Sequence, residues 1–203
     1  MAYTTIDDPS QYFQVEIYTD SDASTDDTTS QTFDGNSDLQ PDWMWFKSSS
    51  LTQPHTLRDS TRGTNKFLYA NDSSAEGTNT YLTSFNSDGF SMNATDNEVN
   101  GNSNTYVAWQ WKANGGTRTT FTESSNNPGG GRQVNTTAGF SIIDYVGTGG
   151  NGTIAHGLGA IPNLVLVKAR DTGTSDSWFT HWTGLLADAA RIIYLNNQDG
   201  QTN

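Results

Sequence analysis

The residues best suited to acid–base or metal chemistry in this chain are its three histidines, His55, His156 and His181. A catalytic or metal-binding histidine needs a nucleophile, a carboxylate or further ligands at a defined spacing. The chain contains neither an H-E-x-x-H zinc motif nor a G-x-S-x-G nucleophile motif. The pattern therefore favours structural histidines held under loops, and we predict no catalytic residue, no metal site and no cofactor.

An acidic stretch, TDSDASTDDTT at Thr19–Thr29, is a second candidate. Its Asp20, Asp22, Asp26 and Asp27 could supply oxygen ligands to Ca²⁺, which takes about six to eight of them. Their spacing does not match the D-x-[DN]-x-[DN]-G pattern of a calcium-binding loop. A solvated acidic loop is the favoured interpretation, and the sequence leaves Ca²⁺ binding by residues 19–29 open.

Glutamates are scarce, and none of them stands in a recognisable motif; they are Glu16, Glu76, Glu98 and Glu123. Hydrolysis of a glycosidic bond requires two carboxyl groups that face each other across a cleft. Nothing in the sequence singles out such a pair. We therefore expect the protein not to be an enzyme.

Composition limits the partners of the chain. It has 203 residues and a net charge of −12, and it lacks cysteine. The acidic balance disfavours nucleic acid and anionic membrane surfaces, and the lack of cysteine excludes disulfides and thiolate chemistry. No apolar run approaches a membrane span, and the start of the sequence does not resemble a secretory signal. We expect synthesis in a cytoplasm without membrane insertion.

The elements that must position these residues are predicted to be short strands. Hydrophobic residues make up only 33% of the chain, so much of the core must come from aromatic side chains. Aromatic and β-branched runs separated by turn-forming residues indicate an all-β protein, an antiparallel β-sandwich. Asp88-Gly89 is a strong hairpin turn signal. The predicted strands are 13–19, 30–34, 41–47, 65–70, 80–85, 89–92 and 104–112.

The last of these strands alternates cleanly, which places Trp109 and Trp111 on one face together with Thr105 and Val107. In a chain that is short of aliphatic residues, a shared tryptophan face is expected to lie in the core. We therefore predict that Trp109 and Trp111 are buried.

The chain also contains an internal repeat. The order and rough spacing of four anchors agree between its two parts, which predicts a second copy of the same domain. The anchors pair Phe13–Tyr18 with Phe140–Tyr145, Pro41–Lys47 with Pro162–Lys168, His55 with His181, and Lys66–Asn71 with Arg191–Asn196.

This alignment replaces Trp43 and Trp45 with leucines, Leu164 and Leu166. Leucine substitutes for tryptophan in a core but not as a platform that stacks on sugar rings. Trp43 and Trp45 are therefore predicted to be core residues.

The predicted organisation has four parts. Residues 1–12 form an N-terminal anchor segment, 13–112 a β-sandwich repeat, 113–138 a Gly-, Ser- and Asn-rich linker, and 139–203 a second, incomplete repeat. The second repeat lacks counterparts of the hairpin and of the Trp-rich strand, so we expect the native chain to continue or another chain to supply them. Leu185–Ile193 could form a helical turn or two.

The sequence resembles a repeat family found in virion structural proteins of marine bacteriophages, often described as tail fibre or tail proteins. The resemblance covers nearly the whole chain. It implies a tail fibre or other appendage that attaches through its N-terminal region and contributes to host attachment. The resembling segments are AYTTIDDPSQYFQVEIYT, FDGNSDLQPDWMWFK, LRDSTRG, SFNSDGF, YVAWQWKANGG and GFSIIDYVGTGGNGTIAHGLGAIPNLVLVK.

The expected partners are other virion proteins, further copies of the chain in a homo-oligomer such as a trimer, and a host-surface glycan. The expected location is the virion, after synthesis in the host cytoplasm. The family contributes no catalytic site. Two alternatives are a carbohydrate-binding, lectin-like module and a polysaccharide-degrading tail enzyme.

Overall fold

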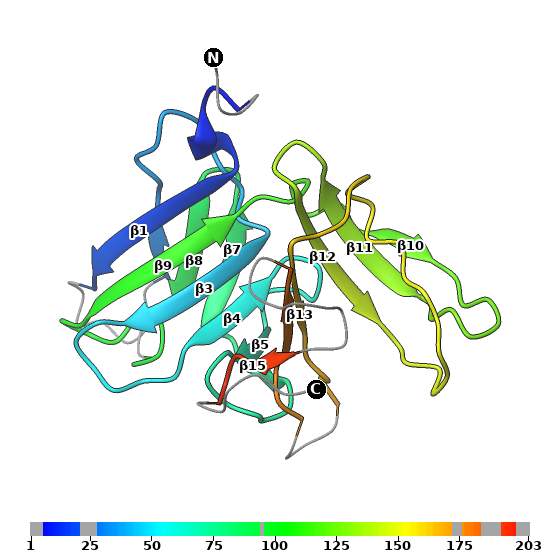
Figure 1. Ribbon diagram of the computed structural model, residues 1–203. Coiled ribbons are helices and arrows are strands. Elements are labelled where there is room, and N and C mark those ends of the chain that lie inside the picture. The colour runs from blue at the N-terminus through cyan, green and yellow to red at the C-terminus, as the bar shows by residue number, and fades with distance from the viewer. Residues whose placement is uncertain (1–5, 21–27, 94–95, 172–175, 184–191, 198–203) are drawn as a thin grey trace.

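The computed structural model describes residues 6–20, 28–93, 96–171, 176–183 and 192–197, which form antiparallel sheets (Figure 1). The largest sheet has six strands. Their order is β1 (Phe13–Thr19), β9 (Thr105–Trp111), β3 (Trp43–Ser48), β4 (Thr56–Asp59), β5 (Lys66–Tyr69) and β6 (Gly77–Thr78).

A three-stranded sheet packs behind the large sheet in the view of Figure 1. Its order is β2 (Thr28–Gln31), β8 (Gly89–Asn93) and β7 (Leu82–Asn86). Gly89 ends the turn between β7 and β8 with a φ of 112°, where a Cβ would collide with the carbonyl oxygen of Gln31. The predicted Asp88-Gly89 hairpin is confirmed, as is the all-β antiparallel class, which is consistent with a β-sandwich.

The core lies between these two sheets. Tyr18 stacks on Tyr106 with 5.4 Å between the ring centroids, and Phe90 of β8 contacts both Tyr18 and Phe46 edge-on. These aromatic residues supply much of the buried area, as the composition led us to expect. The buried cluster comprises Tyr18, Phe33, Leu39, Met44, Phe46, Leu82, Phe90, Met92, Val99, Tyr106 and Ala108.

The prediction that Trp109 and Trp111 are buried is wrong. Both are half-buried, because Tyr106, Ala108 and Gln110 are the side chains that β9 turns to the core. Alternation correctly groups the tryptophans on one face. It could not decide which face is covered, because β9 carries apolar side chains on both.

A short 3₁₀ helix, Pro9–Gln11, precedes β1 and is capped by Asp8. The hydroxyls of Ser10 and Ser37 donate to the Asp8 carboxylate at 2.5 and 2.6 Å, and these hydrogen bonds lower the pKa of Asp8. Attachment through the predicted anchor segment, residues 1–12, stays a prediction, but the order of residues 8–12 needs no other protein. These residues dock on their own chain, and residues 1–5 lie outside the described residues.

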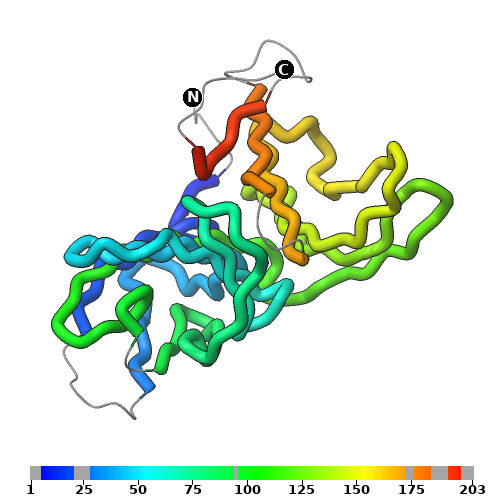
Figure 2. Tube along the Cα trace, turned by 90° about the horizontal axis from the view of Figure 1, so that it is seen from below, coloured from blue at the N-terminus to red at the C-terminus, as the bar shows by residue number. Residues whose placement is uncertain are grey.

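Two further three-stranded sheets follow in sequence, and they lie beside the large sheet (Figure 2). One has the order β10 (Thr119–Phe121), β11 (Gly130–Asn135) and β12 (Phe140–Tyr145). The other has the order β13 (Leu164–Val167), β14 (Phe179–Trp182) and β15 (Ile193–Tyr194). Of the expected helical turn at Leu185–Ile193, residues 185–191 lie outside the described residues, and Ile193 belongs to β15.

The interpretation of residues 113–138 as a linker is corrected by β10 and β11, which both lie within it. The reason is that a polar side chain anchors this segment. Gln133 is fully buried and donates to the hydroxyls of Ser60 and Thr61 at 2.8 Å each, while it accepts from the backbone of Gly116 at 3.1 Å. A search for apolar runs overlooks a strand that is held in this way.

Strands β3–β4–β5, here called the N-terminal unit, and β13–β14–β15, the C-terminal unit, share one strand order and one register. Trp43 pairs with Asp59 as Leu164 pairs with Trp182. Three residue steps on, Phe46 pairs with Thr56 as Val167 pairs with Phe179.

The third strands agree as well, since Thr56 pairs with Tyr69 and Phe179 with Tyr194. This register aligns Pro41–Lys47 with Pro162–Lys168 and Lys66–Asn71 with Arg191–Asn196, as the sequence comparison did.

Hydrogen bonds outside the ladders also recur at matching positions of the two units. Ser60 N–H donates to the Asp42 carbonyl at 2.9 Å, and Thr183 N–H donates to the Asn163 carbonyl at 2.9 Å. The side-chain oxygen of Asn71 accepts from His55 N–H at 2.8 Å. In the C-terminal unit, Asn196 accepts from Trp178 N–H at 2.7 Å.

Two predicted anchors do not fit this register. The position of His55 in the N-terminal unit is taken by Trp178 in the C-terminal one, whereas His181 aligns with Arg58. The pairing of His55 with His181 is therefore wrong. Phe13–Tyr18 and Phe140–Tyr145 also lie in different settings, because β1 pairs with β9 and β12 with β11.

Candidate functional site

The outer face of the large sheet carries a continuous row of aromatic side chains. The ring of Trp111 lies between those of Phe13 and Trp43, with centroid distances of 4.8 and 4.7 Å. Trp45 contacts Trp43 and Trp109 edge-on. The row follows from the alternation of β9 and β3, whose opposite residues face the core.

The C-terminal unit covers one end of this face. Trp178 is buried against Leu57 and Leu68, and its indole N–H donates to the Tyr69 carbonyl at 2.7 Å. Phe140 of β12 also approaches the row, with its ring centroid 6.1 Å from that of Trp43. Trp43 and Trp45 therefore pack in a second, partly covered cluster rather than standing as an open platform.

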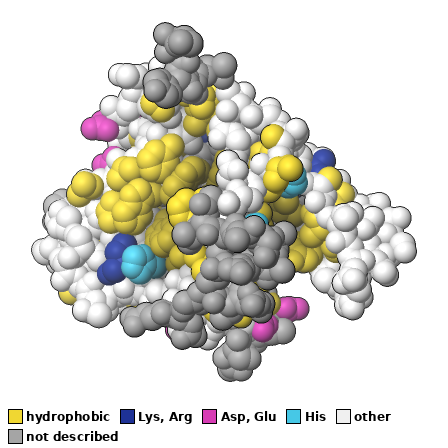
Figure 3. All heavy atoms as spheres, in the orientation of Figure 1, with side chains coloured by type: hydrophobic (Ala, Val, Ile, Leu, Met, Phe, Trp, Pro, Cys, Tyr) yellow, Lys and Arg dark blue, Asp and Glu magenta, His cyan; other side chains and the backbone are white. Residues whose placement is uncertain are grey.

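At the other end of the face, on β1, the apolar side chains are exposed. Phe13, Val15 and Ile17 alternate along β1 and are 37%, 41% and 71% exposed. Figure 3 shows the apolar side chains gathered over β1, β9 and β3 on this side of the molecule. Adjacent exposed apolar side chains of this kind mark a candidate contact surface.

The C-terminal unit also exposes apolar side chains. Leu164 on β13 is 54% exposed, and Phe179 and Trp182 on β14 are 41% and 47% exposed. Val165 is 36% exposed, although it occupies the position of the fully buried Met44 in the N-terminal unit. The face that β2, β7 and β8 cover in the N-terminal unit has no such cover here among the described residues.

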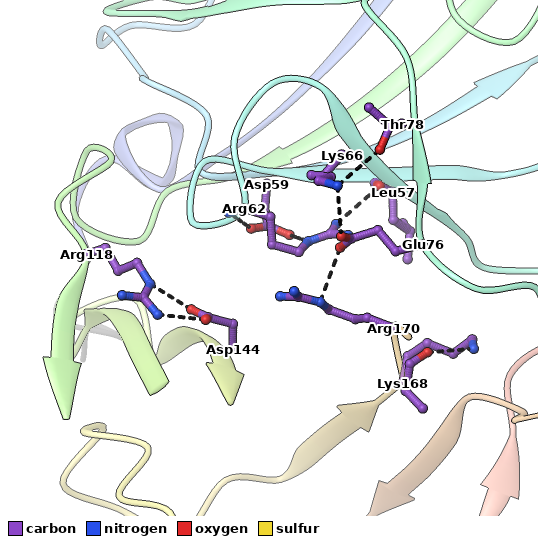
Figure 4. A network of polar contacts seen from close by, with 11 residues as sticks. Leu57, Asp59, Arg62, Lys66, Glu76, Thr78, Arg118, Asp144, Lys168 and Arg170 are labelled. Carbon is purple, nitrogen blue, oxygen red and sulfur yellow. Dashed lines mark hydrogen bonds and ion pairs between the residues drawn. The ribbon is translucent and has the colours of Figure 1, made fainter. Parts of the chain in front are cut away.

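A charged pocket of about 380 Å³ lies where the large sheet, the β10–β12 sheet and the C-terminal unit meet (Figure 4). Glu76 is its central acid. Its carboxylate contacts the guanidinium of Arg62 at 2.9 Å and that of Arg170 at 3.3 Å, and it also lies 3.7 Å from Lys66 Nζ. The lining residues are Thr61, Arg62, Lys66, Glu76, Arg118, Asp144 and Arg170.

Each basic side chain of the pocket has an acidic partner. Arg62 also pairs with Asp59, and Arg118 binds Asp144 in a bidentate manner at 2.8 and 2.7 Å. These carboxylates, through hydrogen bonds and charge, raise the pKa of Arg62 and of Arg118, although burial opposes the rise. The pocket thus contains two groups of ion pairs. The Glu76 group connects the large sheet with Arg170, which follows β13, and the Arg118–Asp144 pair lies within the β10–β12 sheet region.

The histidines predicted to be structural do not lie together. His55 accepts from the Trp45 indole N–H at 2.9 Å through Nδ1, and burial, with Lys47 nearby, lowers its pKa. His156 accepts from the Leu158 backbone at 3.1 Å. His181 stands in β14.

The acidic candidates are dispersed too. Asp20 is buried at the end of β1, and Asp22, Asp26 and Asp27 lie outside the described residues. Glu98 accepts from the Tyr69 hydroxyl at 2.6 Å, and burial raises the pKa of Glu98. Within the described part of the chain, no group of three or more potential ligands could hold a metal ion.

Sequence reasoning missed the burial of Arg58. Arg58 is fully buried on β4, where its guanidinium donates to the Thr64 carbonyl at 3.0 Å and to Asn79 at 2.7 Å and lies over the Phe67 ring. Burial lowers its pKa to about 10. An arginine in the segment LRDSTRG gave no sign in the sequence that it points inward.

Fold and surfaces together define an all-β protein of antiparallel sheets with exposed apolar sheet faces. Among the described residues, no helix is long and apolar enough to cross a membrane. The family DUF7483, a domain of unknown function, matches residues 8–203, and the chain belongs to this family. No curated protein matches the chain, and no solved structure does.

Proposed function

We propose that the chain is a non-catalytic structural protein of a bacteriophage particle, a tail fibre or other appendage that contributes to host attachment. Its partners are other virion proteins and copies of itself. The exposed apolar face on β1 is the observation that carries this proposal, because Phe13, Val15 and Ile17 form a contact surface without accompanying catalytic chemistry. The assignment to a bacteriophage particle rests on the resemblance of the sequence to phage appendage proteins.

The matching register of the N-terminal and C-terminal units supports a tandem arrangement of one structural unit. The family that the sequence resembles is a repeat family, and in repeat proteins each unit contacts its neighbours. In the proposal, the N-terminal region attaches the protein to the particle. The C-terminal unit then lies farther from the point of attachment.

Immunogold labelling of purified particles tests the location. We expect gold at a fixed position on the particle. If the protein stays in the soluble fraction of the lysate while intact particles remain unlabelled, the proposal is wrong.

A pair of variants tests the contact surface. Ile17→Asp places a charge in the apolar face of β1, whereas Thr19→Asp places the same charge on the same strand at an exposed polar position. Fewer copies per particle are expected for the Ile17 variant only. Equal incorporation of the two variants would show that β1 makes no contact in the particle.

A lectin-like module that binds an acidic saccharide is the second candidate. It is favoured by the charged pocket, where Arg62, Lys66, Arg118 and Arg170 gather in a chain with a net charge of −12. We rank it below assembly because each of these cations already has a carboxylate partner. Saturable binding of a sialylated or uronic-acid oligosaccharide that is lost in Arg170→Ala would reverse this order.

A further inference from the structure

The outer edge of β13 is unpaired among the described residues. In the C-terminal unit β13 pairs with β14 alone, whereas the matching strand of the N-terminal unit, β3, has β4 on one edge and β9 on the other. The N-terminal unit therefore provides an internal template for what the free edge can accept.

Backbone alternation shows which groups this edge presents. The Asn163 carbonyl accepts from Thr183, beyond the end of β14, so the peptide groups of Leu164 and Leu166 turn to the opposite edge. The N-terminal unit shows the same alternation. The backbone N–H of Ser49, which follows β3, donates to the Thr105 carbonyl of β9 at 2.8 Å, so every second residue of β3 turns to β9. Leu164 and Leu166 thus occupy the places from which Trp43 and Trp45 pair with β9.

Within β13 itself, among the described residues, the edge carries no charged side chain, proline or bulge that would protect an open strand, although Pro162 and Lys168 flank the strand. Natural edges are protected by charged side chains, bulges or a covering element. The strand itself, Leu-Val-Leu-Val, has no charge, and the side chains of Asn163, Leu164 and Val165 are exposed. An uncharged, exposed edge of this kind is suited to strand addition.

We propose that the outer edge of β13 accepts an antiparallel strand from another polypeptide, in the register that β9 takes on β3. The template also states the chemistry of that strand. Trp111 lies opposite Trp43 and Trp109 opposite Trp45, with the polar Gln110 between them. The incoming strand therefore carries large apolar side chains opposite Leu164 and Leu166, separated by a small or polar residue. The proposal adds a contact to the assembly function but does not depend on where the protein resides.

The probe is a fluorescein-labelled synthetic peptide with the sequence of residues 104–112, NTYVAWQWK, extended by lysines for solubility. Its fluorescence anisotropy is measured against the full chain, with a scrambled peptide as control. We expect saturable binding of the β9 peptide and none of the scrambled one. Absence of saturable binding would mean that this edge does not accept a strand in the register of β9, and would overturn the proposal.

A matched pair of variants locates the binding. Leu164→Pro removes an outward N–H at an exposed edge position, where proline is tolerated, whereas Leu164→Ala removes the side chain and keeps the N–H. Binding of the β9 peptide should weaken about tenfold or more in the proline variant, and only about threefold or less in the alanine variant. Equal binding by the folded proline variant and the unmodified chain would overturn the proposal.

A second measurement keeps the test decisive if the proline variant does not fold. In the unmodified chain, the NMR signals of the Leu164 and Leu166 amides should shift on titration with the β9 peptide. Saturable binding that leaves both amides unchanged would place the peptide elsewhere and overturn the proposal. Either result stands whether or not the protein is found on particles, so this inference and the assembly function can fail separately.

Discussion

The N-terminal unit and the C-terminal unit have one register and recurrent hydrogen bonds, but they differ in what covers them. Met44 and Thr56 are fully buried in the first, whereas the matching Val165 and Phe179 are 36% and 41% exposed. Register is a local property, set by the pairing of neighbouring strands and by short hydrogen bonds such as that from His55 to Asn71. Burial depends on the strands that other parts of the chain add.

The comparison also shows how the units hold together. Trp178 of the C-terminal unit inserts against β5 of the N-terminal unit, and Arg170 extends the Glu76 network across the same boundary. The N-terminal unit thus completes part of the C-terminal unit's packing on one face. Among the described residues, no strand pairs with the outer edge of β13, and Val165 stays partly exposed.

The largest effect should separate Met44→Ala from Val165→Ala. Met44 has no exposed surface, so its truncation should lower the free energy of unfolding by about 2–5 kcal/mol. The same change at Val165, which is already one-third exposed, should cost about 1 kcal/mol or less. Urea unfolding of the two variants measures both values, and equal losses would break the comparison.

A smaller loss of stability, equal in the two units, is expected when a hydrogen bond that recurs in both units is removed. Asn71→Ala and Asn196→Ala each remove the acceptor of a backbone N–H, at 2.8 and 2.7 Å. Each should cost about 0.5–1.5 kcal/mol by thermal or urea unfolding. A loss confined to one of the two variants would mean that the matching hydrogen bonds do not reflect a shared unit.

The smallest effect concerns pH. The lowered pKa of His55 means that folding disfavours its protonation, so the stability contributed by this residue is present above its ordinary pKa of 6.5. That contribution is lost as the pH falls through 6.5 toward the folded-state pKa. We expect the unmodified chain to lose more stability than His55→Gln on moving from about pH 7.5 to about pH 5.5.

This pH effect is expected for the N-terminal unit alone, because the residue at the matching position of the C-terminal unit, Trp178, does not titrate. Urea midpoints at the two pH values provide the measurement. Identical pH responses of His55→Gln and the unmodified chain would show that the indole bond from Trp45 does not depend on a neutral His55.

Much of the fold could be predicted from patterns of short range. The Asp88-Gly89 turn and the alternation of β9 follow from local chemistry. The similarity of the short segments that begin at Pro41 and Pro162 correctly predicted two strands in matching positions. Local patterns could not reveal which face of β9 is covered, because that depends on β2 and β8 from elsewhere in the chain. They also missed β11, whose place is fixed by the buried amide of Gln133 rather than by apolar residues.

The candidate surfaces were less accessible to prediction than the fold. The scarcity of motifs led to an expectation of no catalytic site, but nothing in the sequence marked Glu76 as the centre of an ion-pair network. Its partners Arg62 and Arg170 are far apart in the chain and meet only when the units pack. The exposure of the apolar side chains on β1, like that of the tryptophans on β9, depends on which face of the sheet the strands β2 and β8 cover.

Amide hydrogen exchange at matching positions of the two units tests the central claim most directly. If the units share a register and differ in their outer edges, the Trp43 and Trp45 amides, paired with β9, should exchange slowly. The Leu164 and Leu166 amides should exchange far faster than those of Val165 and Val167, which face β14. Protection of the Leu166 amide equal to that of Trp45 would contradict the account.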